Sequence, residues 1–486
     1  MADAPLQTSV VNGVRTNTYN VTVPVDHSKD NGPSEMLRIF VREVILEKDA
    51  ATANKKEALL WLQGGPGFPA TRPTFPLSGW MDAASKKGFR IFLLDQRGTG
   101  MSSPITPASL QRRFSDLSSP AGAQAAASFL THFRADSIVH DCEVVRKNIL
   151  GPEAKFTLLG QSFGGFCILS YLSLFPDSIE RCLFTCGLAP VLQPPDEVYT
   201  ATFRRLATRN RRYYERYPGD VVLVRDIASY IRDKGPIALP SGGLLTLRRF
   251  LMTGLELGSA GGLEELHFIM EGAWSEASGE PGDQRYLSAQ FLNAMDRIFD
   301  FETNPIFWML HEAIYCNGPG ISSQWAASRV KSTLELTGAP YNLFNADNAG
   351  GSSGKPHLEE SSLPLEDQQT PIYFSGEMVY PWMGDGDFAA LAPLRGVAEI
   401  LAQKNDWPEL YDIEGLRGVS NKVPCAALIS YDDMYVEREF SEQTAELMNC
   451  KVWITNEFQH GGIRDEGARV FNTVLGIANG EIAIPS

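Results

Sequence analysis

A short glycine-rich sequence constrains the fold of this chain more than any other feature. An apolar run at residues 156–159 is followed by Gly160-Gln-Ser162-Phe-Gly164, and an apolar helical segment begins directly after it. This pattern predicts a nucleophile elbow, a strained strand-to-helix turn that projects a serine side chain. The glycines are needed because the strand and the helix pack closely there. We therefore expect Ser162 to be a catalytic nucleophile.

A second match to the same pattern, Gly350-Gly-Ser352-Ser-Gly354, lies in a polar, turn-rich stretch at residues 343–370. An elbow requires a strand before the serine and a helix after it, and this stretch has neither pattern. We expect it to be a loop without catalytic chemistry.

The organisation of the chain indicates a sheet that is interrupted and then resumed. Short β-branched or aromatic runs alternate with amphipathic segments in the first third, which predicts an α/β fold with a mostly parallel sheet. From about 190 to 415 helical spacing replaces the strand pattern. We predict a core of residues 1–189 and 416–486 with a large helical cap, residues 190–415, inserted before the last strands. Strands are expected at 18–23, 37–46, 58–62, 89–94, 156–159, 182–186, 424–430 and 452–455, and a helix at 136–150.

Composition excludes several classes of function. The 486 residues are 43% hydrophobic, which is ordinary for a globular protein, and the net charge of −15 disfavours nucleic acid and anionic membranes as partners. No apolar run is long enough to cross a bilayer, and the first residues lack a secretory signal pattern, so we expect a cytoplasmic protein. The seven cysteines contain no C-x-x-C pair, and no H-E-x-x-H or G-x-G-x-x-G motif is suitably placed, so we expect neither metal nor cofactor. The pattern leaves the oligomeric state open.

A nucleophilic serine needs a histidine base and an acid that orients it, and in an elbow enzyme these follow the serine in the order acid, then histidine. His460 fits the base, because it follows a strand-like run and precedes two glycines. The other histidines precede the serine or fall in the expected cap. Asp432 and Asp433 both follow the strand expected at 424–430. Only one of them can point at the imidazole, since neighbouring side chains at a strand end diverge.

An elbow enzyme also needs two backbone N–H groups directed at the developing oxyanion. One is expected from Phe163, the residue after the serine. The other is expected from Gln63-Gly-Gly-Pro-Gly67, a loop that follows the strand at 58–62. Asp95 and Arg97 end the neighbouring strand, and we expect them to brace this loop through charge-assisted hydrogen bonds rather than to take part in the chemistry.

Three ordered motifs, Gln63-Gly-Gly-Pro-Gly67, Asp95-Gln-Arg-Gly-Thr-Gly-Met-Ser102 and Gly160-Gln-Ser-Phe-Gly-Gly165, together resemble the proline iminopeptidases, a branch of the α/β-hydrolase superfamily. The length and the long middle segment are similar to the larger, fungal-type members. The resemblance implies an α/β-hydrolase fold and Gly65 as the second oxyanion donor. It also selects Asp433 over Asp432, because the family's acid stands just before a Met-like position. One departure is Gln63, where many members have histidine.

The resemblance further implies cap glutamates that bind the amine of an N-terminal proline. Trp308-Met-Leu-His-Glu312 and Glu377-Met-Val-Tyr380 are similar to the two family contexts, which nominates Glu312 and Glu377, with Glu265 in reserve. A carboxylate among aromatic rings needs a partner, and a substrate ammonium would supply one. The alternative is that these are ordinary surface charges.

The expected function is a serine hydrolase that releases proline from a short peptide through an acyl-enzyme. Two other interpretations stay open. An esterase, lactonase or acyltransferase acting on a small molecule would keep the triad without needing the glutamates. A binding protein would need none of these residues.

Overall fold

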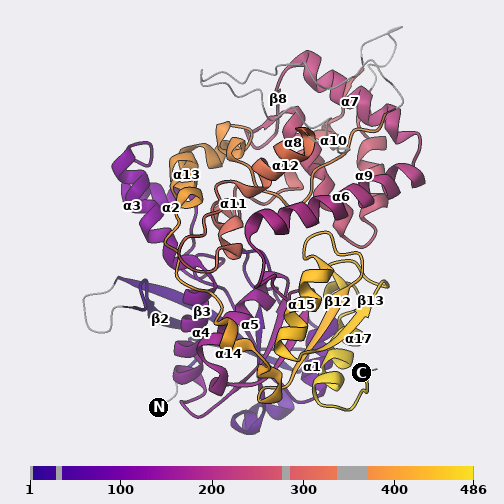
Figure 1. Ribbon diagram of the computed structural model, residues 1–486. Helices are drawn as coiled ribbons and strands as arrows, with labels where there is room; N and C mark the ends of the chain where they lie inside the picture. The colour runs from indigo at the N-terminus through magenta and orange to yellow at the C-terminus, as the bar shows by residue number, and fades with distance from the viewer. Residues whose placement is uncertain (1–3, 29–34, 276–284, 337–369, 485–486) are drawn as a thin grey trace.

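The computed structural model describes residues 4–28, 35–275, 285–336 and 370–484 (Figure 1). The second Gly-x-Ser-x-Gly match, at 350–354, lies outside the described residues. Within the described part, one nine-stranded sheet runs in the order β1-β2-β3-β5-β4-β6-β7-β12-β13. Its strands are β1 (Gln7–Val11), β2 (Val14–Pro24), β3 (Met36–Leu46), β4 (Ala58–Leu62), β5 (Arg90–Leu94), β6 (Phe156–Gln161), β7 (Ile179–Thr185), β12 (Cys425–Ser430) and β13 (Lys451–Thr455).

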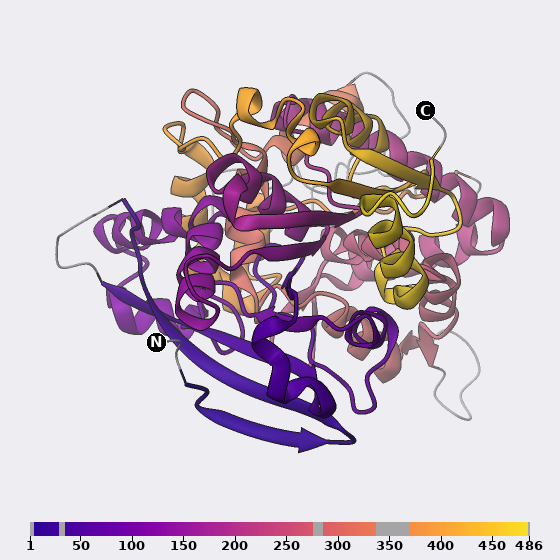
Figure 2. The ribbon, with the colours of Figure 1, turned by 90° about the horizontal axis from the view of Figure 1, so that it is seen from below.

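The prediction of a mostly parallel sheet is confirmed. Each neighbouring pair from β5 across to β13 is parallel, whereas β1, β2 and β3 pair antiparallel and form one edge of the sheet, visible as the long indigo strands in Figure 2. All the expected strands are present, with ends shifted by a few residues. β1 was not predicted, because its five residues are exposed and lack the apolar alternation of a half-buried strand.

Helices cover both faces of the sheet. On one face, α1 (Gly79–Lys86) and α17 (Gly467–Ala478) pack together over the sheet. On the other, α4 (Ala135–Ile149) packs against α5 (Phe163–Leu174), which is buried on nearly every side. The helix predicted at 136–150 is therefore α4. The all-apolar sequence of α5 follows from its central place, since a helix without a polar face must be covered on all sides.

Between β7 and β12 helices make up most of the residues that the structure describes, and much of this part forms a separate layer above the sheet in Figure 1. α14 (Ile413–Leu416) packs back against α5, and α13 (Arg395–Gln403) lies beside α3 (Pro120–Leu130), which follows α2 (Pro107–Phe114). The boundaries of a cap domain at 190 and 415 stay a prediction. The helices are α6 (Pro195–Arg216), α7 (Asp220–Lys234), α8 (Leu247–Leu251), α9 (Gly262–Glu271), α10 (Ala289–Arg297), α11 (Pro305–Leu310), α12 (Ala326–Leu336), α13 (Arg395–Gln403) and α14 (Ile413–Leu416).

Two hairpins, β8 (Ile237–Ala238) with β9 (Leu244–Leu245) and β10 (Trp274–Ser275) with β11 (Tyr286–Leu287), join these helices, and α15 (Arg438–Met448) and α16 (Gly462–Asp465) complete the chain.

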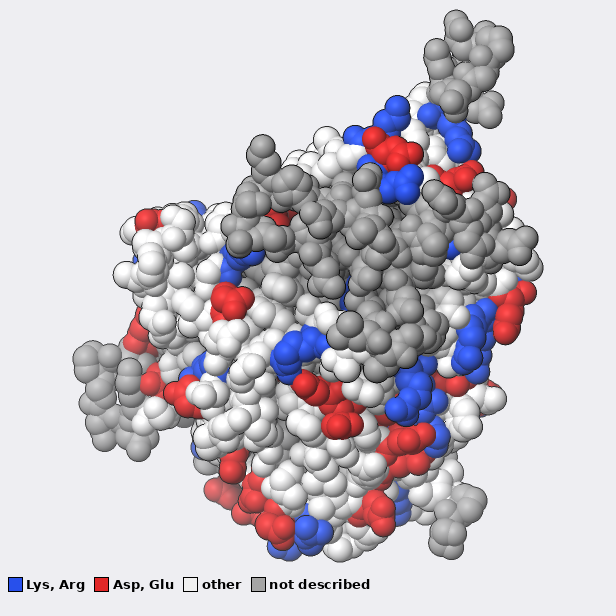
Figure 3. Space-filling view, turned by 45° about the horizontal axis from the view of Figure 1, so that its top comes forward, with Lys and Arg blue, Asp and Glu red and all other residues white. Residues whose placement is uncertain are grey.

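The surface carries charges of both signs. On the face shown in Figure 3, acidic and basic side chains of the described residues are interspersed rather than gathered by sign. None of the helices in the described ranges is long and apolar enough to span a membrane.

Candidate active site

The sequence around Ser162 folds as a sharp turn between β6 and α5. Ser162 has φ 56° and ψ −128°, a left-handed conformation that is costly for a residue with a side chain. A Cβ atom on Gly164 would lie 1.9 Å from the carbonyl oxygen of Leu62, and one on Gly160 would lie 2.5 Å from the backbone of Gly164. The two glycines therefore let β4, β6 and α5 approach closely enough to hold the strained serine.

His460 and Asp433 form a buried hydrogen-bonded pair. His460 follows β13 and Asp433 follows β12, so parallel neighbouring strands deliver both to the same edge of the sheet. The Nδ1 atom of His460 lies 2.7 Å from Oδ2 of Asp433, and the two residues are 4% and 2% exposed. The other carboxylate oxygen accepts the backbone N–H groups of Tyr435 and Val436, at 2.9 and 3.0 Å. Three hydrogen bonds thus fix the orientation of the Asp433 carboxylate.

Asp432 points elsewhere. Its carboxylate forms an ion pair of 2.8 Å with Arg212 on α6. The structure therefore joins Asp433, rather than Asp432, to His460. The elbow lies directly beside this pair, because the side chain of Gln161 donates a hydrogen bond of 3.4 Å to the carbonyl oxygen of His460.

The loop after β4 packs on the elbow. A Cβ atom on Gly64 would lie 3.1 Å from the Cβ of Ser162, and Gly65 has φ 134°. Among the described residues, no internal hydrogen bond uses the N–H groups of Gly65 or Phe163, so both can donate to a substrate oxygen. Gln63 stabilises the loop: its Oε1 accepts the indole N–H of Trp61 at 2.9 Å.

The expectation for Asp95 and Arg97 is half correct. Asp95 braces the segment that continues the loop, accepting hydrogen bonds from Arg72 at 2.7 Å and from the N–H of Ala70 at 3.1 Å. Arg97 does not face this loop. Its guanidinium binds Asp141 at 2.6 and 2.8 Å, because the side chain extends from the strand end toward α4.

Two residues beside the pair of His460 and Asp433 were not predicted from the sequence. The ring of Tyr435 stands at 90° to the imidazole of His460, with 4.9 Å between ring centroids, and its hydroxyl donates to the carbonyl oxygen of Leu255. The Sγ atom of Cys186 lies within 4.8 Å of ligand atoms of Asp433 and His460. Burial raises the pKa of the Cys186 thiol well above its ordinary value, which disfavours the thiolate that a metal site would need. No sequence pattern pointed to either residue.

Of the three predicted cap glutamates, Glu377 is the one whose pKa responds to the charges of His460 and Asp433. Burial raises its pKa to about 7, with the charge of His460 lowering it and that of Asp433 raising it. A Cβ atom on Gly376 would lie 3.0 Å from the side chain of Met434, so this segment packs beside the acid. No residue in the described ranges gives the Glu377 carboxylate a hydrogen bond or an ion pair.

Glu312 is buried, but its carboxylate has partners. The oxygens accept the N–H groups of Ala326 and Ala327, each at 3.0 Å, at the start of α12. Burial raises its pKa to about 7 even though these hydrogen bonds oppose the shift. The charges of Glu312 and Glu377 both act on the buried hydroxyls of Tyr199 and Tyr315, so the two glutamates flank one aromatic region.

Glu265 is exposed on α9, beside Glu256. Burial, together with the charge of Glu265, raises the pKa of Glu256 to about 7. Glu256 also acts electrostatically on Tyr435, whose ring stands edge-on to the imidazole of His460. It is a carboxylate near the site that the sequence analysis missed, because it has no aromatic neighbours in the chain.

His311 is a further buried group in this region. It is 1% exposed, and in the part of the chain that the structure describes neither ring nitrogen has a hydrogen-bond partner. Burial lowers its pKa to about 3, so the imidazole is neutral. Its ring lies 4.5 Å from that of Phe307, whose backbone would be 2.9 Å from a Cβ atom on Gly67. α11 therefore rests directly on the loop after β4.

Comparisons with known proteins agree on one group. Residues 57–305, just over half of the chain, match the family described as alpha/beta hydrolase fold. The chain is 38% identical to a proline iminopeptidase of Aeromonas sobria over 467 residues, 96% of this chain and 97% of that protein. It is 29% identical to the proline iminopeptidase aneH of Aspergillus aculeatus over 476 residues, covering 96% and 94%. A tripeptidyl aminopeptidase of Streptomyces coelicolor is 29% identical over 35% of each chain.

Proposed function

The chain belongs to the α/β-hydrolase fold family and to its proline iminopeptidase branch, and we propose that it releases N-terminal proline from peptides with Ser162, His460 and Asp433 as catalytic residues. The observation that carries the proposal is the 2.7 Å hydrogen bond between His460 and Asp433 beside the strained serine. Acyl transfer by a serine requires a nucleophile, a base that takes its proton and an acid that orients the base.

The first half of the reaction forms an acyl-enzyme. Because Nδ1 of His460 donates to Asp433, Nε2 is left to accept the proton of the Ser162 hydroxyl. The serine oxygen then bonds to the carbonyl carbon of proline, and the displaced electron pair forms an oxyanion that accepts the N–H groups of Gly65 and Phe163. Collapse of this intermediate breaks the C–N bond, and the leaving amine takes the proton from Nε2.

The second half repeats the steps with water. His460 removes a proton from the water, whose oxygen attacks the prolyl ester. The same N–H groups hold the oxyanion. Ser162 leaves with the proton from Nε2, and free proline is released. The Asp433 carboxylate stabilises the imidazolium that forms in each half.

The unpartnered Glu377 carboxylate supports an amine substrate. A protonated N-terminal proline carries its charge on the ring nitrogen, one carbon from the acyl group that is attacked. A carboxylate within electrostatic reach of His460 and Asp433 is therefore suitably near to bind it. The aromatic region around Tyr199 and Tyr315 offers an apolar wall for the pyrrolidine ring.

The test compares proline 4-nitroanilide, its N-acetylated form and 4-nitrophenyl butyrate, with the wild type and Ser162→Ala. The proposal would be supported if the wild type cleaved the free-amine anilide and cleaved the acetylated form little. Ser162→Ala should lose the cleavage of every substrate that the wild type cleaves. Serine-dependent cleavage of the butyrate with none of the proline anilide would refute the peptidase function while retaining the hydrolase.

A further inference from the structure

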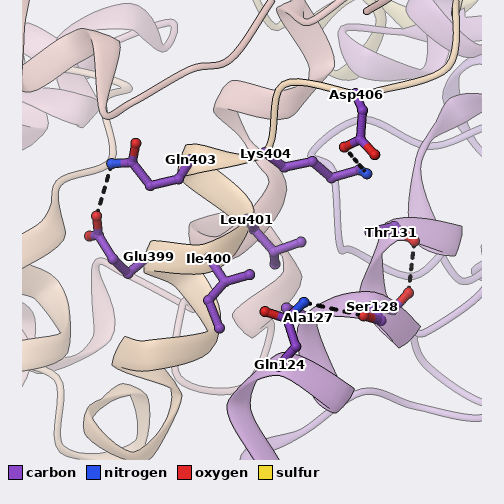
Figure 4. Close-up of a pocket in the computed structure, with 10 residues that line it drawn as sticks. All are labelled: Gln124, Ala127, Ser128, Thr131, Glu399, Ile400, Leu401, Gln403, Lys404 and Asp406. Carbon is purple, nitrogen blue, oxygen red and sulfur yellow. Dashed lines mark hydrogen bonds and ion pairs between the residues drawn. The ribbon is translucent and has the colours of Figure 1, made fainter. Parts of the chain in front are cut away.

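Two hollows on the surface differ in whether the polar side chains that line them have hydrogen-bond or ion-pair partners. One, of about 490 Å³ between α3 and α13, contains Lys404 paired with Asp406 and Gln403 bonded to Glu399 (Figure 4). The other, of about 420 Å³, lies on the antiparallel edge of the sheet. It is lined by Gln7, Ser9, Thr16, Thr18, Arg42, Arg72, Pro73 and Phe75. In the first hollow these polar side chains bond to one another, whereas in the second the guanidinium of Arg42 has no ion pair with any residue that the structure describes.

Arg42 on β3 carries this unpaired charge. Its Nη1 atom is buried and, within the described ranges, has no hydrogen-bond partner. The next residue, Glu43, cannot reach it, because successive side chains of a strand point to opposite faces. Glu43 instead binds Arg90 at 2.7 Å on the other face. Arg42 lies 5.1 Å from the ring centroid of Phe40, which helps to hold its position.

The nearby acid Asp95 is already saturated. One oxygen accepts Arg72 Nη1 at 2.7 Å and Ala70 N–H at 3.1 Å, and the other accepts Arg72 Nη2 at 2.7 Å and Met101 N–H at 2.9 Å. A carboxylate has about four acceptor positions, so none is left for Arg42. Arg72 alone binds this carboxylate, which leaves the positive charge of Arg42 unpaired at the hollow. Burial and the charge of Arg72 lower the pKa of Arg42.

Hydroxyl groups line the same face. Gln7, Thr18 and Arg42 lie opposite one another across β1, β2 and β3. The hydroxyls of Ser9 and Thr16 are 2.7 Å apart and share one hydrogen bond, which leaves one hydroxyl proton to donate elsewhere. Hydrogen-bond donors and an excess positive charge therefore surround the hollow, in a chain whose net charge is −15.

We propose that this hollow binds a small oxyanion, a carboxylate or a phosphoryl group, with the guanidinium of Arg42 as its main ligand and the hydroxyls of β1 and β2 as further donors. The planar fork of arginine suits both kinds of oxyanion, which take two parallel N–H···O bonds. Arg72 keeps Asp95 as its partner and adds its charge from the side. The anion supplies the acceptor that the buried Nη1 atom lacks.

The hollow is connected through one chain segment to the loop of the candidate active site. Arg72 and Ala70 belong to the segment that continues the loop carrying Gly65, and Thr71 donates a 3.4 Å hydrogen bond to Gln63 of that loop. Asp95 binds this segment through the guanidinium of Arg72 and the N–H group of Ala70. Arg72 is therefore unsuitable for a test, since its removal would also release Asp95, whereas Arg42 makes none of these contacts.

The test is isothermal titration calorimetry of the full-length protein with inorganic phosphate and, separately, with succinate, at constant ionic strength. We compare the wild type with Arg42→Gln and with Arg42→Lys, which keeps the charge but loses the fork. Arg15→Gln is the matched control: Arg15 is on β2, pairs with Glu47 at 2.7 Å and does not line the hollow.

We expect saturable binding that weakens about tenfold to a hundredfold in Arg42→Gln, as loss of a charge-assisted hydrogen bond predicts. Arg42→Lys should fall between, and Arg15→Gln should bind as the wild type does. Binding of phosphate alone or of succinate alone would identify which oxyanion the hollow takes. No saturable binding of either up to roughly 50 mM, where a millimolar site would be filled, would overturn the proposal. So would equal affinity in Arg42→Gln.

Discussion

The substitution Glu377→Gln tests the recognition of the substrate amine directly. It keeps the size and polarity of the side chain but removes the negative charge near His460 and Asp433. A charge-assisted hydrogen bond contributes about 1.5–3 kcal/mol, so kcat/KM for proline 4-nitroanilide should fall about 10- to 150-fold. Cleavage of 4-nitrophenyl butyrate, which has no amine, should change less than about twofold, because the triad is untouched.

The pH dependence gives the same experiment a second readout. Burial raises the pKa of Glu377 to about 7. Below that pH the carboxyl becomes neutral and loses its attraction for the substrate cation. KM of the wild type for the proline anilide should therefore rise as the pH falls below about 7, and in Glu377→Gln this rise should be absent.

The control for this experiment is Glu271→Gln, which removes an exposed carboxylate at the end of α9. It should behave as the wild type does with both substrates. If Glu377→Gln lowered the cleavage of ester and anilide equally, Glu377 would be acting on the triad and not on the amine. If it changed neither, the assignment of Glu377 to the amine would be refuted.

Three further predictions follow from the same geometry. Asp433→Asn should lower kcat on both substrates about 10⁴-fold by disturbing the imidazole, whereas Asp432→Asn, which breaks only an ion pair to α6, should cost less than about tenfold in steady-state assays. Gly164→Ala should destabilise the protein by more than about 3 kcal/mol in urea unfolding, because its Cβ would lie 1.9 Å from a backbone oxygen of β4; Gly219→Ala, with nothing within 4 Å, should be near neutral. Glu377→Gln should raise the free energy of unfolding in urea by about 1–2 kcal/mol at pH 8.5. This gain should shrink as the pH falls from about 7 toward 4.5, because the folded state binds the proton of Glu377 more tightly than the unfolded state does. An equal gain at pH 8.5 and pH 4.5 would contradict this prediction.

The parts of the fold that depend on local pattern could be predicted from the sequence. The elbow at Ser162 needs an apolar strand, two glycines and an apolar helix in direct succession. All of these features are local, so the sequence shows them without knowledge of the surrounding structure. The strands of the parallel part are buried on both faces, so their apolar runs are unambiguous. β1 lacks such a run, since its five residues are exposed, and only its pairing with β2 defines it.

The choice between neighbouring or similar side chains depended on tertiary structure. The residues around Asp432 and Asp433 left the choice between them open, and only the family resemblance selected Asp433. In the structure Asp433 bonds to His460, whereas Asp432 pairs with Arg212, 220 residues earlier in the chain. Arg97 was expected at the loop after β4 because it follows Asp95 closely. Its actual partner, Asp141, lies on α4, and no local sequence pattern predicts a contact between two residues that are 44 positions apart.

Glu312 and Glu377 illustrate how two similar carboxylates come to have different hydrogen-bond partners. Both lie among aromatic residues, and burial raises the pKa of each to about 7. The carboxylate of Glu312 accepts two N–H groups at the start of α12, where the helix dipole also favours a negative charge, so its burial is compensated in part within the protein. Glu377 has no such compensation among the described residues, and its desolvation lowers the stability of the empty enzyme above pH 7. A ligand that brings a positive charge removes this cost, so part of the binding free energy for an amine is already built into the folded site. The proposed function therefore assigns the amine to Glu377 rather than to Glu312, whose carboxylate already holds the start of α12.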